Sequence, residues 1–307
     1  MKINFVVPGV FKSGGMRVIW EICNRLALKG HSINIYYPTI PYDQYKNEFS
    51  KKRILEYFYS VRNSIKQKNK KENRYQENFN LIEVLKIDDK RISDADFVFA
   101  TSWTTAYDVF RLNKQKGKKV YFIQDYETWN SNIQLVDKSY SFPFIYISTC
   151  EYLQKFFLNK FNIKPEVVYY GINYEVFYNK NKKSNDNLTL LFMEHGLAKK
   201  NIDALIPVLE KIKRIMPEIK VRCFGLKKFH SFPDYFEFYE NPSDEIIRNL
   251  YSTSDVFIYP SLEEGFGMPP SEAMACKCLA IASTVGAIPE YIKNDETGYL
   301  IDPRNLD

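Results

Sequence analysis

Residues 259–289 read YPSLEEGFGMPPSEAMACKCLAIASTVGAIP, and the fold of this chain is organised around that stretch. An apolar, strand-like run at 255–260 leads into it, and a helix-like run at 271–276 follows its glycines and prolines. The order predicts a strand, a glycine loop and a helix N-terminus. Backbone N–H groups and the positive end of a helix dipole favour a phosphate group at such a junction. Two carboxylates, Glu264 and Glu272, flank the loop.

Both carboxylates also have structural interpretations. Proline suits the first position of a helix, so Pro269 or Pro270 is expected to open the helix and Glu272 to lie in its first turn. A first-turn carboxylate stabilises the helix dipole without any further role, and Glu264 is equally explained as a surface loop acid. A pair of carboxylates is also typical of glycoside hydrolases, but spacing in sequence does not fix the distance between them.

An alternation of strands and helices extends on both sides of this stretch and predicts the fold class. A polar segment rich in Lys and Asn, 171–187, interrupts the alternation. We therefore predict an α/β protein with two Rossmann-like doubly wound domains facing a cleft, 1–171 and 172–307. The predicted strands are 2–7, 33–37, 80–87, 96–100, 119–124, 144–148, 166–170, 188–193, 220–224, 235–239 and 256–259. The predicted helices are 16–29, 104–116, 151–161, 202–215 and 243–251.

The composition excludes several classes of protein. With 45% hydrophobic and 26% charged residues, the chain is an ordinary globular protein, and no apolar run reaches the ~20 residues of a membrane span. The apolar run after Met1 is too short for a signal peptide. The five cysteines are scattered without a CxxC pair, which predicts reduced thiols and a cytoplasmic location.

The net charge of +6 is concentrated in residues 46–80, which hold ten Lys or Arg and four Glu. These residues dominate a basic helical insertion predicted at 42–78. Its partial apolar stripe fits a solvated helix that packs on the sheet, or a helix that lies on an anionic membrane surface. Nucleic-acid binding is disfavoured, because no recognition fold accompanies the charge.

Two glycines, Gly14 and Gly15, stand at the entrance of the first helix. The segment lacks the GxGxxG pattern of dinucleotide-binding proteins, which argues against a nicotinamide dehydrogenase. A tight turn before a helix explains the pair as well as a phosphate contact does.

The late motifs together resemble a known family. Residues 264–275, 287–290 and 296–303 are similar to the signature of retaining glycosyltransferases of family 4, which have the GT-B fold. The Ser13-Gly-Gly15 segment resembles the N-terminal glycine loop of that family, and Lys199-Lys-Asn201 resembles its phosphate-binding lysine segment. The resemblance spans both predicted domains, and its C-terminal part is the most specific.

The resemblance implies a donor site for a nucleotide diphosphate sugar. In it, Glu272 would hold the ribose hydroxyls, the catalytic Glu264 would contact the transferred sugar, and the catalytic Lys200 would neutralise the diphosphate. The family needs no metal and no cofactor, because cationic side chains and helix dipoles stabilise the leaving group. The other donor-binding positions implied by the resemblance are Gly14, Gly15, His195, Gly265, Phe266, Gly267 and Met268.

The sequence departs from the family pattern at three places. His195 stands where members carry an arginine, and it either donates to phosphate when protonated or is a structural histidine. Trp103 stands near a usual histidine, and it either stacks on a sugar or packs internally. The family's last helix crosses back to the first domain, and residues 172–307 are expected to lack it.

Asp125 and Tyr126 are expected on the acceptor side of the cleft, together with Trp103. The Asp125-Tyr-Glu127 segment also resembles the metal-binding motif of the other large glycosyltransferase fold. That fold has a single domain and lacks the late glutamate pair, so a metal site is not predicted.

The function expected from the resemblance is a metal-independent, retaining hexosyltransferase. It would act in polysaccharide or glycoconjugate synthesis, on a glycan or lipid-linked acceptor, in the cytoplasm or at the inner face of the membrane. One alternative is a nucleotide-sugar-binding or scaffolding module without turnover. Another is a phosphorylase or nucleotide-sugar epimerase of the same fold.

Overall fold

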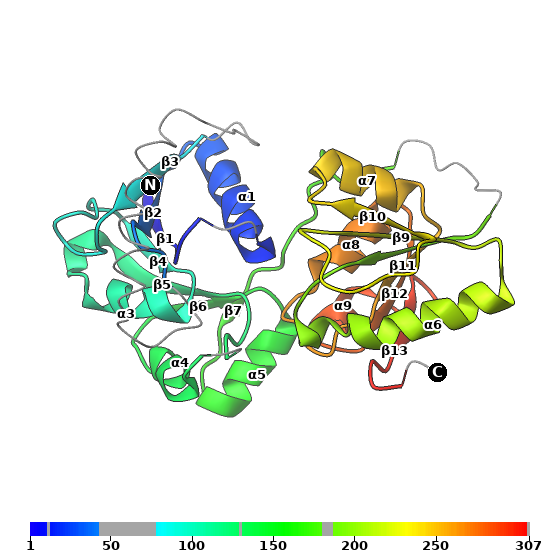
Figure 1. Cartoon of the computed structure of the whole chain (residues 1–307). Helices are drawn as coiled ribbons and strands as arrows, with labels where there is room; N and C mark the ends of the chain where they lie inside the picture. Colours follow the sequence, from blue (N-terminus) through cyan, green and yellow to red (C-terminus); the bar gives the residue numbers. More distant parts are fainter. Residues whose placement is uncertain (11–12, 43–77, 129–130, 180–186, 306–307) are drawn as a thin grey trace, which may run out of the picture. The chain divides into compact units, whose positions relative to one another are not determined.

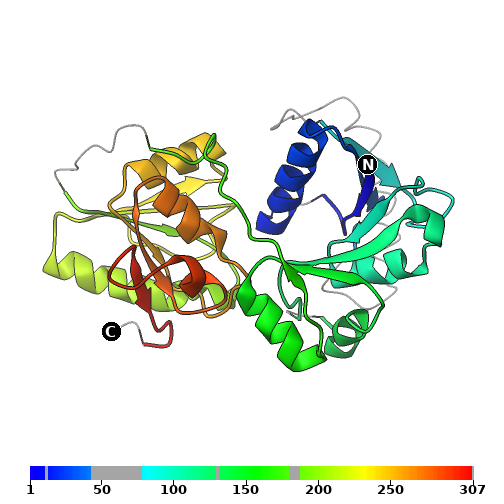
Figure 2. The same ribbon diagram turned by 180° about the vertical axis from the view of Figure 1, so that it is seen from behind.

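The computed structural model describes residues 1–10, 13–42, 78–128, 131–179 and 187–305. It divides into two compact units, one made of Met1–Thr149 and Leu153–Tyr169, the other of Cys150–Tyr152 and Tyr170–Asp307. Each unit is a parallel sheet flanked by helices (Figures 1 and 2), which confirms the predicted α/β fold class. Apart from its two end residues, the basic insertion predicted at 42–78 lies outside the described residues, as does most of the 46–80 segment expected to meet a membrane.

The first sheet has the strand order β3-β2-β1-β4-β5-β6-β7, with every pair parallel. The order reverses between β1 and β4, where Val6 pairs with Ala100. The strand bounds are β1 Lys2–Val6, β2 Ser32–Pro38, β3 Asn80–Val84, β4 Phe97–Ala100, β5 Lys118–Ile123, β6 Ile145–Ser148 and β7 Glu166–Val167. Their near-continuous apolar sequences are typical of strands covered on both faces.

The described helices of the first unit are α1 Gly14–Leu28, α3 Trp103–Arg111, α4 Ile133–Ser139 and α5 Glu151–Phe161, whose first two residues fall in the second unit, with a 3-10 turn at Lys114–Lys116. Polar side chains cap the starts of three of them, Ser13 at α1, Ser102 at α3 and Asn132 at α4. The helix predicted at 104–116 is shorter in the structure because Leu112 is extended (φ −63°, ψ 145°), and Asn113 caps the separate 3-10 turn. The short helix α4 was not predicted, although Asn132 accepts hydrogen bonds from two of its first amides.

The second sheet has the order β10-β9-β8-β11-β12-β13, again all parallel, and reverses between β8 and β11. Its strands are β8 Thr189–Met193, β9 Lys220–Gly225, β10 Phe236–Glu240, β11 Val256–Tyr259, β12 Leu279–Ser283 and β13 Tyr299–Ile301. Its helices are α6 Ile202–Ile215, α7 Asp244–Ser252, α8 Met268–Ala275 and α9 Ile288–Tyr291, with a 3-10 turn at Ala198–Lys200.

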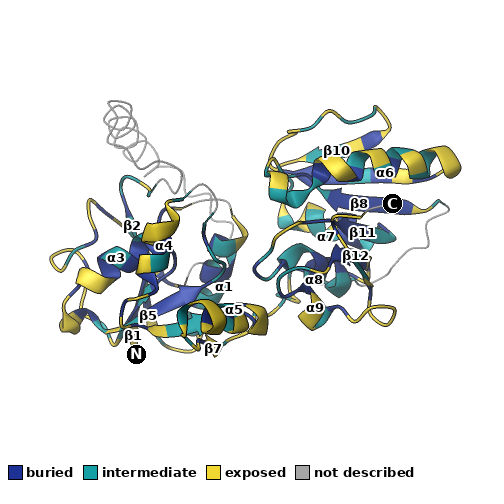
Figure 3. Ribbon diagram, turned by 90° about the horizontal axis from the view of Figure 1, so that it is seen from below, coloured by how far each residue is buried: buried dark blue, intermediate teal, exposed yellow. Residues whose placement is uncertain are grey.

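Alternate strand residues of the second sheet enter two hydrophobic clusters, one on each face. Phe192 and Ile258 pack with Leu205 and Leu209 of α6. Phe257 and its neighbours pack in the other cluster with residues of α7 and α8. Figure 3 shows the outcome, with buried strands and an exposed outer side on α6. The sheet is thereby fixed from both faces, and its strand ends present loops at defined positions.

Candidate functional site

The carboxyl ends of β8 and β11 form the switch point of the second sheet. Open parallel sheets bind ligands outside such ends, because the connections there leave in opposite directions. β8 ends at Met193 and leads to His195, and β11 ends at Tyr259 and leads to Glu264. The late glycine loop and the lysine segment predicted from sequence therefore leave from adjacent strands.

Three side chains at this switch point form a closed hydrogen-bonded network. The Lys200 ammonium donates to Glu264 Oε1 at 2.5 Å and to the Tyr259 hydroxyl at 2.8 Å. The Tyr259 hydroxyl donates to the same Glu264 oxygen at 2.7 Å. The Lys200 and Glu264 side chains are only 12% and 10% exposed. Glu264 is therefore a shielded, ion-paired carboxylate and not a surface loop acid.

The environment of Tyr259 keeps its hydroxyl protonated. Burial and the Glu264 carboxylate raise the pKa of Tyr259 well above its usual value. A protonated hydroxyl donates to Glu264 and accepts from Lys200, as the geometry requires. Tyr259 was not assigned to the site from sequence, because the network depends on residues far apart in the chain.

Close backbone contacts fix the shape of the glycine loop. Gly267 has φ +77° and is the N-cap of α8, and its carbonyl accepts a hydrogen bond from the Tyr291 hydroxyl at 2.5 Å. Gly286 has φ +57°, and a Cβ there would lie 2.3 Å from the Glu264 carbonyl oxygen. The Ala287 amide donates to the Gly265 carbonyl at 3.0 Å. The segment around 287 therefore supports the loop that carries Glu264.

The start of α8 differs from the prediction. The first helical residue is Met268, so Glu272 lies beyond the first turn, and Pro269 and Pro270 occupy the second and third positions. These prolines remove two of the N–H groups that a helix N-terminus offers to an anion. The amides of Gly267 and Met268 remain, and no side chain caps this end.

Glu272 is buried, with 5% exposure. Burial raises the pKa of Tyr291 most, and the Glu264 and Glu272 carboxylates raise it further, so both carboxylates act electrostatically on the same hydroxyl. Phe266 stacks on the Tyr291 ring with centroids 5.4 Å apart. The structure thus brings the two predicted acids, the glycine loop and Lys200 into one part of the second unit.

His195 lies beside this network in a neutral state. Burial and the nearby Lys200 lower the pKa of its imidazole. Its Nδ1 accepts a hydrogen bond from the Leu197 amide at 3.2 Å, which leaves the proton on Nε2. This environment opposes the expectation that His195 acts as a cation, and leaves its Nε2–H as the available donor.

Sequence reasoning missed the buried Glu194, which holds the loop after β9. Its Oε1 accepts from the amides of Phe229 and His230 at 2.8 and 3.0 Å, and lies 2.8 Å from His230 Nδ1. A Cβ at Gly196 would lie 2.3 Å from the Phe229 ring. The loop is folded tightly against the end of β8, and no short motif in the sequence marks this.

Gly14 and Gly15 adopt helical geometry at the start of α1 and do not form a tight turn. Ser13 caps α1, accepting from the Met16 amide at 3.3 Å, and neither Gly14 nor Gly15 has a positive φ. A Cβ at Gly14 would meet nothing within 4 Å, while one at Gly15 would lie 3.2 Å from Gln124 Oε1. Packing in this unit therefore gives little reason for glycine at position 14.

At the first switch point, Trp103 and Glu127 are both buried. The Trp103 amide donates to Glu127 Oε2 at 2.9 Å, and its indole makes an edge contact with Tyr107. Burial raises the pKa of Glu127 to about 8. These contacts favour internal packing of Trp103 over stacking on a sugar. Glu127 was considered from sequence only as a metal ligand.

Tyr126 and Asp125 take part in local contacts. The Tyr126 hydroxyl donates to Asp137 at 2.6 Å and bonds to Lys160, and its ring packs against Phe156 of α5. Asp125 accepts from the Tyr126 amide at 2.8 Å. Their expected place on an acceptor side stays a prediction.

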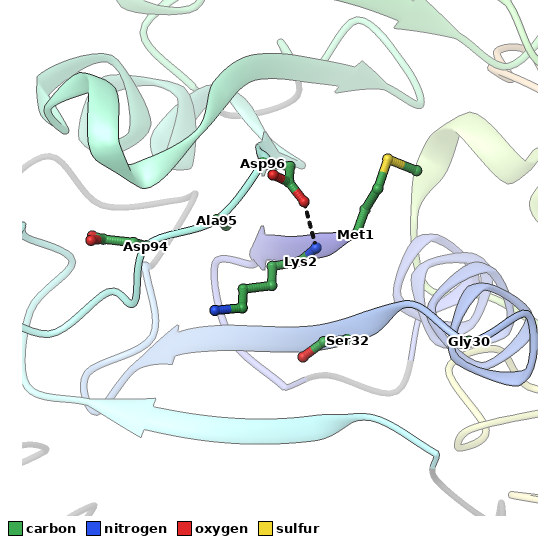
Figure 4. Close-up of a pocket in the computed structure, with 7 residues that line it drawn as sticks. All are labelled: Met1, Lys2, Gly30, Ser32, Asp94, Ala95 and Asp96. Atoms are coloured by element: carbon green, nitrogen blue, oxygen red, sulfur yellow. Dashed lines mark hydrogen bonds between the residues drawn. The ribbon is translucent and has the colours of Figure 1, made fainter.

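A hollow in the first unit lies at the opposite end of the strands (Figure 4). It is lined by Met1, Lys2, Gly30, Ser32, Asp94, Ala95 and Asp96. The Lys2 amide donates to Asp96 at 2.8 Å. This hollow is at the amino ends of β1 and β2, away from the carboxyl ends of the strands where open parallel sheets bind ligands.

Some features are absent from the described part of the chain. None of its helices combines the length and apolar character needed to cross a bilayer. None of its His, Cys, Asp and Glu side chains gather in threes that would hold a metal ion. The five cysteines, all described, are buried and form no disulfide.

Comparison with protein families matches residues 174–307 to the family described as Glycosyl transferases group 1. The gpi3 subunit of phosphatidylinositol N-acetylglucosaminyltransferase of Schizosaccharomyces pombe is 25% identical over 128 residues, covering 38% of this chain and 28% of that protein. O-antigen chain mannosyltransferase B of Escherichia coli is 39% identical over 64 residues, covering 21% and 16%. The matches thus span less than a third of either relative.

Solved structures resemble the whole chain. Sucrose-phosphate synthase from Thermosynechococcus elongatus has a TM-score of 0.71 at 16% identity, covering 99% of this chain and 86% of that one. HepE of Anabaena in complex with UDP and glucose has a TM-score of 0.71 at 14% identity, with the same coverage. WaaG, a glycosyltransferase involved in lipopolysaccharide biosynthesis, has a TM-score of 0.64 at 16% identity, covering 98% and 86%. The predicted GT-B fold is confirmed by these likenesses.

Proposed function

We propose, from the premise that residues 174–307 belong to the glycosyl transferases group 1 family, that this chain transfers a sugar from a nucleotide diphosphate sugar to an acceptor hydroxyl. The transfer retains the configuration at the anomeric carbon. The observation that carries the proposal is the Lys200–Tyr259–Glu264 network at the second switch point. It puts a cation and a carboxylate side by side where a sheet of this kind binds ligands.

The shielded Lys200 ammonium suits a diphosphate. A nucleoside diphosphate gains negative charge as it leaves, and a donor held in place beforehand stabilises that charge without reorganising. The neutral His195 lies near Lys200 and offers its Nε2–H as a further donor. The amides of Gly267 and Met268 at the start of α8 are also proposed as donors to the ligand. These groups supply the charge stabilisation for which a metal-independent reaction calls.

The two carboxylates take different parts of the donor. Glu264 contacts the transferred sugar. Its Oε1 accepts a hydrogen bond from Lys200, so it lies beside the ammonium that is proposed to bind the diphosphate. The buried Glu272 accepts hydrogen bonds from the ribose hydroxyls. With Glu264 engaged by Lys200 and Tyr259, we favour a front-face route in which the leaving phosphate accepts the acceptor's proton.

The names of similar proteins support a nucleotide-sugar donor and a glycan product. HepE was solved with UDP and glucose, and WaaG acts in lipopolysaccharide biosynthesis. The O-antigen mannosyltransferase is a further polymer-building relative. The positive charge of 46–80 supports an acceptor at an anionic membrane surface, reached from the cytoplasm. We therefore include a glycan or lipid-linked acceptor in the proposal.

The test combines binding with turnover in wild type and Glu272→Ala. Nucleoside diphosphates of uridine, guanosine and adenosine are screened for a rise in Tm. The best one is compared with its 2′-deoxy form by calorimetry. We expect wild type to prefer the ribose form, and Glu272→Ala to lose most of that preference and about 10-fold in affinity, because a buried acceptor of two hydroxyls is removed.

The exposed Glu218→Ala serves as the control. Release of nucleoside diphosphate from the matching nucleotide sugar in the presence of acceptors then separates an enzyme from a binding module. A Glu272→Ala variant with full donor affinity and turnover contradicts the assignment of the ribose site. Binding without any release of diphosphate supports the module instead.

A further inference from the structure

Tyr259 is the element of the network that the proposed chemistry leaves without a role. Among the described residues, two hydrogen bonds reach the Glu264 carboxylate, one from Lys200 and one from Tyr259. Both end on the same oxygen, Oε1. In the chain without a ligand, the Lys200 ammonium is thus hydrogen-bonded to the Glu264 carboxylate.

Binding of a nucleotide sugar weakens the hydrogen bond between Lys200 and Glu264. A diphosphate carries more negative charge than one carboxylate and competes for the Lys200 ammonium. As the ammonium turns toward phosphate, its bond to Glu264 lengthens. The Tyr259 hydroxyl has no comparable attraction to phosphate once it donates its only proton to Glu264. It remains the group that holds the carboxylate.

Tyr259 is itself held rigidly. It is the last residue of β11, it is 3% exposed, and its backbone pairs with Ala282 of β12. Its ring stacks on Phe257 with centroids 5.9 Å apart at 24°. The Ser283 hydroxyl donates to its carbonyl at 3.4 Å. A side chain on a sheet strand defines a position more tightly than one on a loop.

We infer that Tyr259 is a positioning residue of the proposed donor site, which keeps Glu264 aimed at the sugar while Lys200 is drawn to the diphosphate. The inference rests on the proposed function. Tyr259 acts through Glu264 and does not touch the reacting atoms. Removing its hydroxyl therefore affects turnover more than donor binding.

The experiment measures Tyr259→Phe, which keeps the ring and its packing. Affinity for the nucleoside diphosphate is measured by calorimetry, and kcat and KM by release of that diphosphate from the matching nucleotide sugar. We expect kcat to fall about 10- to 100-fold, as for loss of a hydrogen bond to a charged group, with donor affinity within about 2-fold of wild type. Tyr239→Phe is the matched control, because that hydroxyl also donates to a glutamate, Glu237, away from the network.

A double-mutant cycle with Glu264→Gln distinguishes a positioning role of Tyr259 from a purely structural one. It compares the loss of kcat that Tyr259→Phe causes in the wild-type chain with the loss that it causes in Glu264→Gln. If Tyr259 acts through Glu264, Tyr259→Phe costs less than about 3-fold in kcat once Glu264 has been replaced. Additive losses overturn the inference. So does wild-type kcat in Tyr259→Phe, or a loss of affinity equal to the loss of kcat.

Two further outcomes are informative. Where Tyr259→Phe does not fold, site-specific 3-fluorotyrosine at 259 keeps shape and hydroxyl but changes the acidity of the donor. A change in kcat without a change in affinity then supports the inference, and an unchanged kcat overturns it. A wild-type chain that neither binds nucleoside diphosphates nor releases them from nucleotide sugars refutes the proposed function and the role of Tyr259 with it. An active wild type with an equally active Tyr259→Phe refutes only the latter.

Discussion

Both units reverse their strand order between two central strands, β1 and β4 in the first sheet and β8 and β11 in the second, yet the side chains at the two switch points differ. The second has a close ion pair, Lys200 with Glu264, bridged by a tyrosine. The first has a helix that begins at two glycines and a buried carboxyl, Glu127, with a raised pKa. One architecture therefore holds a charged pair at one edge and favours an uncharged carboxyl, Glu127, at the other.

The difference teaches that the fold alone does not locate the chemistry. In the second unit, burial is offset by pairing, so both groups at the edge are held ready for a charged ligand. In the first unit, burial favours the neutral form of Glu127, because it outweighs the hydrogen bond that the Trp103 amide donates to the carboxylate. A diphosphate is attracted to the Lys200 ammonium of the second unit, whereas a neutral Glu127 offers it no charge. Substitutions at each edge test this contrast.

Removing the cation of the second edge is expected to have the largest effect. Lys200→Met deletes the ammonium and keeps most of the side-chain volume. We expect turnover with a nucleotide sugar to fall about 100- to 1,000-fold, because a prearranged donor to the leaving group is lost. Affinity for the nucleoside diphosphate should fall about 10-fold or more, measured by calorimetry.

Lys211→Met, at an exposed lysine of α6, is the control for loss of one positive charge. Full turnover in Lys200→Met would break the contrast between the edges, since the charge at the second switch point would then serve only stability.

The buried carboxyl of the first edge makes a prediction about pH and stability. The pKa of Glu127 is about 8 in the folded chain, against an ordinary value of 4.5, chiefly through burial. Between these values the folded state holds its proton more tightly than the unfolded state does. The stabilisation is therefore complete below about pH 4.5 and is lost as the pH rises through 8.

Glu127→Gln imitates the protonated acid and removes this dependence. The Tm of the variant relative to wild type should rise by roughly 3–8 °C between pH 5 and pH 8. The same substitution at the exposed Glu166 of β7 controls for loss of a carboxylate. A Tm difference that stays constant with pH would mean that Glu127 is not a buried acid.

The sequence was a better guide to the sheets than to the side-chain contacts. Apolar runs located most strands and the helices at 151–161 and 202–215, because local periodicity reports burial directly. The short helix α4 escaped because seven residues give too little periodicity. The helix predicted to 116 was too long, since the turn at Leu112 depends on backbone geometry that hydrophobicity does not encode.

The sequence indicated the loops that form the candidate site, but it did not indicate which side chains hydrogen-bond to one another there. The glycine loop, Lys200 and the two glutamates follow from motifs. That Tyr259 bridges Lys200 and Glu264, or that Glu194 holds His230, depends on how separate segments meet at strand ends. The neutral state of His195 is likewise set by burial and a lysine five positions away, which the residue type alone does not reveal.

The smallest predicted effect concerns Glu264→Gln, and it gives the sharpest comparison. We expect this substitution to raise the affinity for nucleoside diphosphate, whereas a substitution that damages a binding site lowers it. In the free chain, Glu264 occupies the Lys200 ammonium at 2.5 Å. Glu264→Gln removes the negative charge that competes with a diphosphate. We expect affinity for the nucleoside diphosphate to rise about 3- to 10-fold while turnover with the nucleotide sugar falls, because a partly buried ion pair no longer has to be broken.

Glu263→Gln, at the exposed neighbouring glutamate, should change neither, and Glu127→Gln at the other edge should leave affinity unchanged. A fall in diphosphate affinity in Glu264→Gln would show that the Glu264 carboxylate positions Lys200 for phosphate and does not compete with phosphate for the ammonium. The two switch points would then differ in how they position charged groups, and not in whether a charged group is available to a ligand.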